Sequence, residues 1–133
     1  MTRPSSLEDR ARAAQNRAYA PYSKFRVGAA LQMSGQVFDG ANVENASYSL
    51  TMCAERAAIA TAVVDGAREL EAIAICTDAS PPSSPCGACR QVLREFAKDP
   101  ATVTVIAINP AGERRTWTLA QLLPDSFSGR ELP

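Results

Sequence analysis

Stretches of apolar residues along the chain predict most of its β-strands. Residues 27–34 and 37–43 contain apolar residues and lie on either side of Gly35, which predicts a β-hairpin. Residues 70–77 and 102–109 are almost continuously apolar, as in strands that are buried on both faces of a sheet. The chain is therefore expected to contain a β-sheet.

A last strand is expected at residues 114–118, after the turn sequence at 109–112. That turn is too short for a crossover connection, so the strand must run antiparallel to the one at 102–109. The strands alternate with helical segments along the chain. The fold class that follows is α/β, with a mixed sheet covered by helices on both faces.

The first helix is expected from about Ser6 to Ala20, ended by Pro21. Ser5 and Glu8 have the spacing of a capping box at its start. Apolar residues recur along one face at helical spacing. They are Leu7, Ala11, Ala14 and Ala18.

Further helices are expected from near Cys53 to near Gly66, from around Cys86, and briefly after Leu119. The polar segment 42–51 and the proline- and serine-rich segment 78–85 are predicted to be loops. The helix that starts near Cys86 directs three residues inward. They are Val92, Leu93 and Phe96.

Size and charge restrict the kinds of ligand. The 133 residues predict one domain, spanning residues 1–133. The 14 basic and 14 acidic residues are interspersed and give a formal net charge of zero, with no basic run beyond Arg114-Arg115. Proteins that grip polynucleotides usually present a basic face. The composition therefore favours a small, roughly neutral ligand over nucleic acid.

The cysteine content and the lack of long apolar stretches indicate the compartment. The longest apolar run, residues 57–64, is far too short to span a bilayer, and no signal peptide is recognisable. Four cysteines without a secretory signal point to a reducing compartment, so a cytoplasmic protein without a membrane partner is expected. Histidine is absent, which leaves thiolate as the only soft metal ligand.

Three cysteines and one glutamate form the strongest chemical pattern. Cys86 and Cys89 have the CxxC spacing that zinc accepts, and Cys53 supplies a third sulfur. Three protein ligands leave the fourth position of a tetrahedral zinc open for water, as in catalytic sites. Glu55 lies two residues from Cys53, within reach of that water. This combination is the signature of zinc deaminases, in which the glutamate transfers protons and is not a ligand.

The charges around these sulfurs need compensation. Cys53, Cys86 and Cys89 lie at predicted helix N-termini, where the helix dipole favours thiolate. Three thiolates outweigh the charge of a zinc ion, so a cation is expected beside them. Arg56 is the first candidate, because it lies three residues after Cys53 on the same helical face, and Arg90 is the second.

Two alternatives use the cysteines differently. Cys76 could complete a closed, structural four-cysteine zinc site, although a lone cysteine in an apolar strand is usually a small hydrophobic residue. Cys86 and Cys89 could also form a thioredoxin-like redox pair. Neither alternative explains Glu55 beside Cys53.

From about Tyr22 to Phe127 the chain resembles the small all-cysteine cytidine deaminases that form homotetramers. The resemblance rests on several segments. They are Tyr22-Ser23-Lys24-Phe25, Val27-Gly28-Ala29-Ala30, Asn42-Val43-Glu44-Asn45-Ala46-Ser47-Tyr48, Cys53-Ala54-Glu55-Arg56, Pro85-Cys86-Gly87-Ala88-Cys89-Arg90-Gln91 and Leu123-Pro124-Asp125-Ser126-Phe127. The segments at residues 42–48 and 123–127 are much more specific to this family than the zinc motif, which many deaminases share.

The resemblance implies a three-layer α/β/α fold around a five-stranded sheet. It implies one Zn²⁺ per subunit, with three cysteine ligands, Glu55 as the catalytic residue and Arg56 bonded to the ligand sulfurs. It also implies a set of substrate contacts, in which Phe25 packs on the pyrimidine and Phe127 reaches a neighbouring subunit's site. They are Phe25, Asn42, Glu44, Ala54 and Phe127.

The implied activity is hydrolytic deamination of cytidine and deoxycytidine, a step of pyrimidine salvage. Asn42 and Glu44 are expected to bind the ribose hydroxyls, and the carboxylate should favour nucleosides over nucleotides. Alternatives are a deaminase of modified cytosine nucleosides, a polynucleotide-editing deaminase and a non-catalytic zinc-binding module. The ribose-binding segment argues against the first, and the zero net charge against the second.

Overall fold

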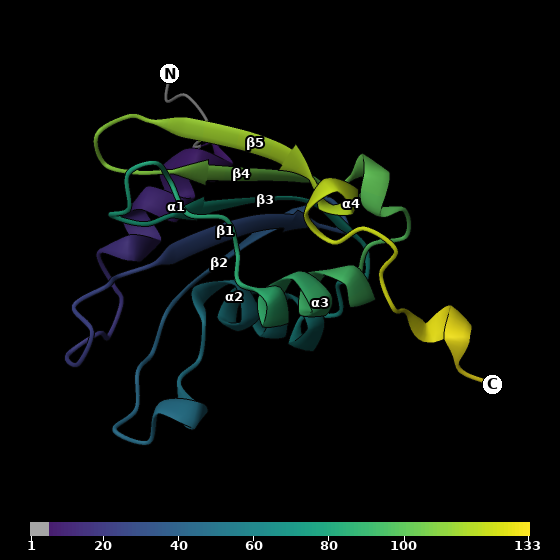
Figure 1. Cartoon of the computed structure of the whole chain (residues 1–133), viewed down its shortest axis with the longest axis horizontal. Coiled ribbons are helices and arrows are strands. Elements are labelled where there is room, and N and C mark those ends of the chain that lie inside the picture. The colour runs from purple at the N-terminus through teal and green to yellow at the C-terminus, as the bar shows by residue number, and fades with distance from the viewer. Residues whose placement is uncertain (1–5) are drawn as a thin grey trace.

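The computed structural model describes residues 6–133, which form a five-stranded mixed sheet covered by helices (Figure 1). The strand order is β2-β1-β3-β4-β5. The strands are β1 (Gly28–Met33), β2 (Gln36–Ala41), β3 (Leu70–Cys76), β4 (Thr104–Ile108) and β5 (Arg114–Thr118). β3 and β4 are parallel and all other neighbours are antiparallel, which confirms the predicted mixed sheet and its antiparallel last pair.

Helices cover both faces of this sheet. The helices are α1 (Leu7–Gln15), α2 (Ala54–Val64), α3 (Gly87–Glu95) and α4 (Leu119–Leu122), with 3-10 turns at Tyr48–Leu50, Pro100–Thr102 and Gly129–Glu131. Figure 1 shows α2 and α3 together on one side of the sheet and α1 on the other. The predicted three-layer α/β/α architecture is therefore confirmed. Among the residues described, no helix is long and apolar enough to cross a membrane.

The two faces of the sheet enclose two separate apolar cores, because successive residues of a strand point to opposite faces. In β1, Ala29 and Leu31 pack in the core under α2 and α3, whereas Ala30 packs in the core under α1. In β3, Ile73 and Ile75 face α2 and α3, and Ala74 and Cys76 face α1. The central strands are buried on both sides, which explains their continuous apolar sequence.

The predicted extent of the first helix is wrong at its C-terminal end. α1 ends at Gln15, before Ala18 and Pro21. The chain then runs beside the loop after β2: the Tyr19 N–H donates to the carbonyl oxygen of Asn42 at 2.9 Å. The Tyr19 carbonyl oxygen in turn accepts from the N–H of Glu44 at 2.8 Å. These bonds to a distant segment replace further helical turns.

The start of α1 differs by one residue from the predicted capping box. Ser6 is the N-cap: its hydroxyl accepts from the N–H of Asp9 at 3.1 Å, and its own N–H donates to the Asp9 carboxylate at 3.4 Å. Ser5 lies outside the described residues. Ser and Asp at this spacing satisfy two N–H groups that a helix start otherwise leaves without partners.

Gly40 allows α2 to approach the sheet closely enough to place its N-terminus. A Cβ atom at Gly40 in β2 would lie 2.6 Å from the backbone nitrogen of Ala58 and 2.9 Å from the carbonyl oxygen of Ala54. Any side chain there would push α2 away from β2. Since α2 carries the Cys53-Ala54-Glu55 sequence at its start, this glycine helps to set the position of the candidate site.

Candidate metal centre and active site

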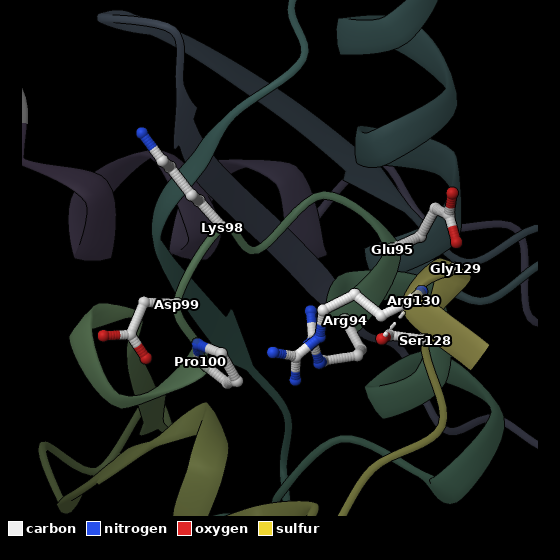
Figure 2. Close-up of a pocket in the computed structure, with 8 residues that line it drawn as sticks. All are labelled: Arg94, Glu95, Lys98, Asp99, Pro100, Ser128, Gly129 and Arg130. Carbon is white, nitrogen blue, oxygen red and sulfur yellow. Dashed lines mark hydrogen bonds between the residues drawn. The ribbon is translucent and has the colours of Figure 1, made fainter.

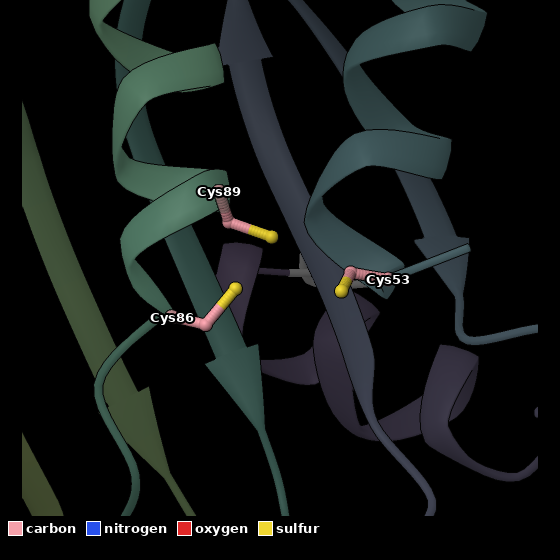
Figure 3. Close-up of side chains that lie close together, drawn as sticks. All are labelled: Cys53, Cys86 and Cys89. Atoms are coloured by element: carbon pink, nitrogen blue, oxygen red, sulfur yellow. The ribbon is translucent and has the colours of Figure 1, made fainter. Parts of the chain in front are cut away.

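Three cysteine sulfurs converge between the N-termini of α2 and α3 (Figure 3). Cys53 is the N-cap residue of α2, Cys86 is the N-cap residue of α3, and Cys89 lies in the first turn of α3. Their Sγ atoms all lie within 4.8 Å of one another. The sequence therefore placed all three cysteines at helix N-termini correctly, and the fold brings the two helix starts together.

The spacing and chemistry of these sulfurs fit a zinc ion. Zn–S bonds of about 2.3 Å place two sulfurs of one tetrahedral ion roughly 3.8 Å apart, compatible with the observed cluster. Among the described residues no further His, Cys, Asp or Glu joins the three thiols. A tetrahedral ion held here therefore keeps one position free of protein ligands, as catalytic zinc does.

Cys76 is separated from this centre. It is fully buried in the core under α1, and its thiol donates to the side-chain oxygen of Gln15 at 3.2 Å. The alternative of a closed four-cysteine site is thus wrong, and the interpretation of Cys76 as a small hydrophobic residue is confirmed. Burial also raises the pKa of the Cys76 thiol, which keeps it protonated.

Arg56 supplies positive charge beside the sulfurs. Its Nη2 donates to the Cys53 Sγ at 3.5 Å and to the carbonyl oxygen of Thr51 at 3.3 Å. A hydrogen bond from the Cys89 thiol, then the hydrogen bond and positive charge of Arg56 and a hydrogen bond with Cys86, lower the pKa of Cys53 to about 5. The buried Nε of Arg56 has no acceptor among the described residues. Thiolate ligands around an ion would offer such acceptors, which supports the predicted contact of Arg56 with the ligand sulfurs.

Arg90, the second cation considered, is bonded elsewhere. Its Nε donates to the carbonyl oxygen of Pro85 at 2.7 Å and its Nη1 to that of Leu122, also at 2.7 Å. Its Nη2 donates to the Ser84 hydroxyl at 2.8 Å. Arg90 therefore ties the loop that precedes Cys86 to the end of α4, a structural connection that the sequence does not show.

Glu55 lies buried in the first turn of α2, next to the thiols. Burial is the main cause that raises the pKa of its carboxyl group, and the negative charge on Cys53 raises it further. A carboxyl group with a raised pKa holds a proton more strongly than an exposed glutamate does, as a group that passes protons on to a substrate must. The surroundings of Glu55 thus suit it to proton transfer.

A cavity of about 280 Å³ opens beside the thiols and Glu55. It is lined by groups from the metal centre, from the loop before β1 and from the loop after β2. They include Phe25, Asn42, Glu44, Ala54, Glu55 and Cys86. Ile75 and Thr77, at the end of β3, complete a largely apolar wall that the sequence analysis did not assign to the site. Every predicted substrate contact except Phe127 lies around this one cavity.

Asn42 fixes the loop that carries Phe25. The side chain of Asn42 is buried, its Oδ1 accepts from the N–H of Val27 at 2.9 Å, and its Nδ2 donates to the carbonyl oxygen of Phe25 at 2.9 Å. Phe25 itself stays partly exposed on the cavity wall. Asn42 therefore has a structural function besides any contact with a ligand.

The Glu44 carboxylate is held at the rim of the cavity by the segment at Tyr22-Ser23. Oε1 accepts from the backbone N–H groups of Tyr22 at 3.0 Å and Ser23 at 3.1 Å, and Oε2 accepts from the Ser23 hydroxyl. These bonds, that of the Ser23 hydroxyl first, lower the pKa of Glu44 and keep it ionised. Ser23 is thus a residue of the site that sequence reasoning missed, although it lies within a matching family segment.

Phe127 does not line the cavity of its own chain. Its side chain is exposed, and its carbonyl oxygen accepts from the Gln91 side chain at 3.0 Å. Gln91 belongs to α3, so the tail is anchored to the helix that carries Cys89. The ring therefore remains available to a neighbouring molecule.

Comparisons with known proteins agree with this geometry. Residues 1–108 match the family described as cytidine and deoxycytidylate deaminase zinc-binding region. The chain is 48% identical to the cytidine deaminase of Sporosarcina psychrophila over 120 residues, or 90% of this chain and 87% of the relative. It is 43% identical to the cytidine deaminase of Mycobacterium tuberculosis over 117 residues, or 87% of this chain and 83% of the relative.

A solved structure shows the same fold. The crystal structure of cytidine deaminase from Burkholderia pseudomallei superimposes with a TM-score of 0.85 at 48% sequence identity, covering 91% of this chain and 96% of that chain. The crystal structure of cytidine deaminase from Mycobacterium tuberculosis superimposes with a TM-score of 0.77 at 40% sequence identity, covering 91% of this chain and 94% of that chain. Fold, three-thiol centre and sequence similarity together show that the chain belongs to the cytidine deaminase family.

Proposed function

We propose that this chain catalyses the zinc-dependent hydrolysis of cytidine and deoxycytidine to uridine and deoxyuridine, with release of ammonia. The observation that carries the proposal is the position of Glu55: a buried carboxyl group with a raised pKa, beside three thiols that fit one Zn²⁺, on the wall of a ligand-sized cavity. A structural zinc site does not require a buried carboxyl group beside its ligands. The names of the related proteins point to the same substrate class.

The chemistry divides between the metal and Glu55. When bound, zinc lowers the pKa of a water molecule at its open position, so that a nucleophile is available at neutral pH. With zinc held by Cys53, Cys86 and Cys89, Glu55 would accept a proton from the attacking water and deliver it to the ring nitrogen N3 of cytosine. Protonation at N3 makes C4 electrophilic, and the water oxygen adds there. Glu55 would then carry the proton of the new C4 hydroxyl to the amino group on C4, so that the C4–N bond breaks, ammonia leaves and the C4 carbonyl of uracil forms.

The remaining residues bind and orient the nucleoside. Phe25 offers an aromatic face for the pyrimidine ring, and Ala54 lies at the wall next to Glu55. Glu44, fixed and ionised, accepts hydrogen bonds from ribose hydroxyls, while Asn42 supports the loop and offers its remaining amide N–H. The negative charge of Glu44 disfavours a nearby phosphate, so nucleosides are preferred to nucleotides.

The assembly and cellular context follow from the family resemblance. The chain is a single domain that forms a homotetramer, in which the exposed ring of Phe127 enters the active site of a neighbouring subunit. Each site is then incomplete in an isolated subunit. The reaction serves pyrimidine salvage in the cytoplasm, with a small nucleoside as substrate and without a nucleic-acid partner.

The direct test is the ultraviolet absorbance of cytidine, and then deoxycytidine, incubated with the purified zinc-loaded protein. A steady change to the uridine spectrum, together with release of one ammonia per nucleoside, is the expected result. A Glu55→Gln preparation with the same zinc content serves as the control for contaminating activity. No change in absorbance with zinc bound would overturn the proposed substrate and leave modified cytosine nucleosides as the next class to test.

A further inference from the structure

A second cavity, of about 410 Å³, lies at the C-terminal end of α3 (Figure 2). It is enclosed by the end of this helix, the turn at Pro100–Thr102 and the C-terminal tail around Ser128. None of the groups around the thiols or the substrate cavity lines it. This cavity is therefore separate from the candidate active site of the same chain.

Arg94 is a buried cation at this cavity. Only 7% of the residue is exposed, its Nε donates to the Ser126 hydroxyl at 2.9 Å, and its Nη1 donates to the carbonyl oxygen of Ala97 at 2.8 Å. These bonds use two of the five N–H groups of the guanidinium. Among the described residues no acceptor serves Nη2, and the ion pairs found there do not include Arg94.

The position of Arg94 in α3 explains only part of this arrangement. Arg94 lies in the last turn of α3, where carbonyl groups and the helix dipole favour a positive charge. The dipole compensates about half an elementary charge and supplies no anionic acceptor for Nη2. Buried charged groups are normally paired with an opposite charge. No carboxylate lies within ion-pair distance of Arg94 among the described residues, so its Nη2 keeps hydrogen-bonding capacity for a ligand in the cavity.

A second guanidinium lines the same cavity. Arg130 is exposed, and its side chain donates to no acceptor in the described part of the chain. Figure 2 places the side chains of Arg94 and Arg130 in the centre of the view and Lys98 at its edge. Glu95 and Asp99 also line the cavity, but neither lies within ion-pair distance of these cations among the described residues. An anion bound in this cavity could accept hydrogen bonds from both guanidinium groups and reduce the repulsion between their charges.

We propose that this cavity binds a phosphate-bearing small molecule. Guanidinium groups match phosphate oxygens with two parallel hydrogen bonds, and a phosphate carries the double charge that two arginines can neutralise. The volume of about 410 Å³ exceeds that of one phosphate group and leaves room for the molecule that carries it. Pro100, Ser128 and Gly129 provide the uncharged part of the wall.

The test is calorimetric titration of the zinc-loaded, full-length protein with inorganic phosphate, pyrophosphate and adenosine 5′-monophosphate at constant ionic strength. Saturable binding of at least one of them is expected. Arg130→Gln, which removes no internal hydrogen bond, should weaken binding at least ~10-fold, because charge-assisted hydrogen bonds are lost. Arg17→Gln removes the same charge from an exposed residue outside this cavity and is the matched control, with unchanged affinity expected.

The three ligands separate the sources of the phosphate group. Tighter binding of pyrophosphate or the nucleotide than of phosphate supports a phosphorylated metabolite, and equal binding supports free phosphate. The proposal is overturned if none of the three binds saturably, or if Arg130→Gln binds as tightly as the unsubstituted protein. A changed oligomeric state of Arg130→Gln without phosphate binding would also overturn it, because the arginines would then pair with carboxylates of a second copy. Binding is measured without turnover, so the result does not depend on the proposed deaminase activity.

Discussion

The side-chain amide of Asn42 is hydrogen-bonded to the backbone of Phe25, so the residue proposed to hold the sugar also fixes the residue proposed to hold the base. The Nδ2 of Asn42 donates to the Phe25 carbonyl oxygen, while its Oδ1 accepts from Val27 two residues further on, both at 2.9 Å. Phe25 is thus positioned without being buried itself. The two proposed nucleoside contacts, Asn42 and Phe25, are therefore linked by a direct hydrogen bond.

Asn42→Ala should therefore lower both stability and nucleoside binding. Each backbone group left without a partner costs about 1–3 kcal/mol of unfolding free energy. Denaturant unfolding of the zinc-loaded variant and the KM for cytidine measure the two effects. Asn16→Ala removes an exposed amide whose side chain makes no hydrogen bond among the described residues, so it is the matched control and should leave the unfolding free energy nearly unchanged. An Asn42→Ala variant with unaltered stability would contradict the structural function of this amide.

Glu44→Ala should weaken nucleoside binding without lowering stability, because the carboxylate lies at the exposed rim and its partners can turn to water. An increase of at least ~10-fold in the KM for cytidine is expected from the loss of charge-assisted hydrogen bonds to the ribose. The sharper measurement compares cytidine with 2′,3′-dideoxycytidine, which lacks both hydroxyls. The preference for cytidine should nearly vanish in the variant, and its persistence would show that Glu44 does not contact the sugar.

The sequence predicted the strands and the thiol cluster because both depend on local patterns. Continuous apolar runs identify β3 and β4, and the CxxC spacing together with Cys53 identifies the metal centre. The end of α1 could not be predicted, since it depends on hydrogen bonds between Tyr19 and a segment more than twenty residues away. For the same reason the backbone contacts of Asn42 and Arg90 are invisible in the sequence, where their partners are not adjacent.

Glu55→Gln should keep zinc and lose at least ~100-fold in kcat, because one carboxyl group carries out several proton transfers. The amide has nearly the same shape, so the buried position beside the thiols is retained. Zinc content by elemental analysis and single-turnover kinetics with cytidine are the measurements. Near-normal turnover by a fully zinc-loaded variant would remove Glu55 from the proposed mechanism.

The catalytic activity lost in the Phe127→Ala variant should be restored by a neighbouring subunit that supplies an intact Phe127. If the ring enters the site of a neighbour, mixed oligomers of Phe127→Ala and Glu55→Gln chains contain sites with an intact Glu55 and a Phe127 supplied by the partner. The activity of the co-expressed mixture should then exceed the sum of the two variants measured separately. Co-expressed Cys53→Ala and Glu55→Gln chains are the control without rescue, because each chain lacks a group in its own site. Purely additive activity in the first mixture would place Phe127 outside the neighbouring site.

The zinc content of two variants, Cys76→Ala and Cys53→Ala, distinguishes a three-cysteine catalytic centre from a four-cysteine structural site. Cys53 lies within 4.8 Å of the other two sulfurs of the cluster, so its loss should release zinc during dialysis against a mild chelator. Cys76 lies in the core under α1, bonded to Gln15, and its replacement should keep one zinc per chain. The expected cost of Cys76→Ala is a drop in stability of about 1 kcal/mol from the lost packing and hydrogen bond. Loss of zinc from Cys76→Ala with the fold intact would contradict the three-thiol centre, and with it the open coordination position on which the proposed hydrolysis depends.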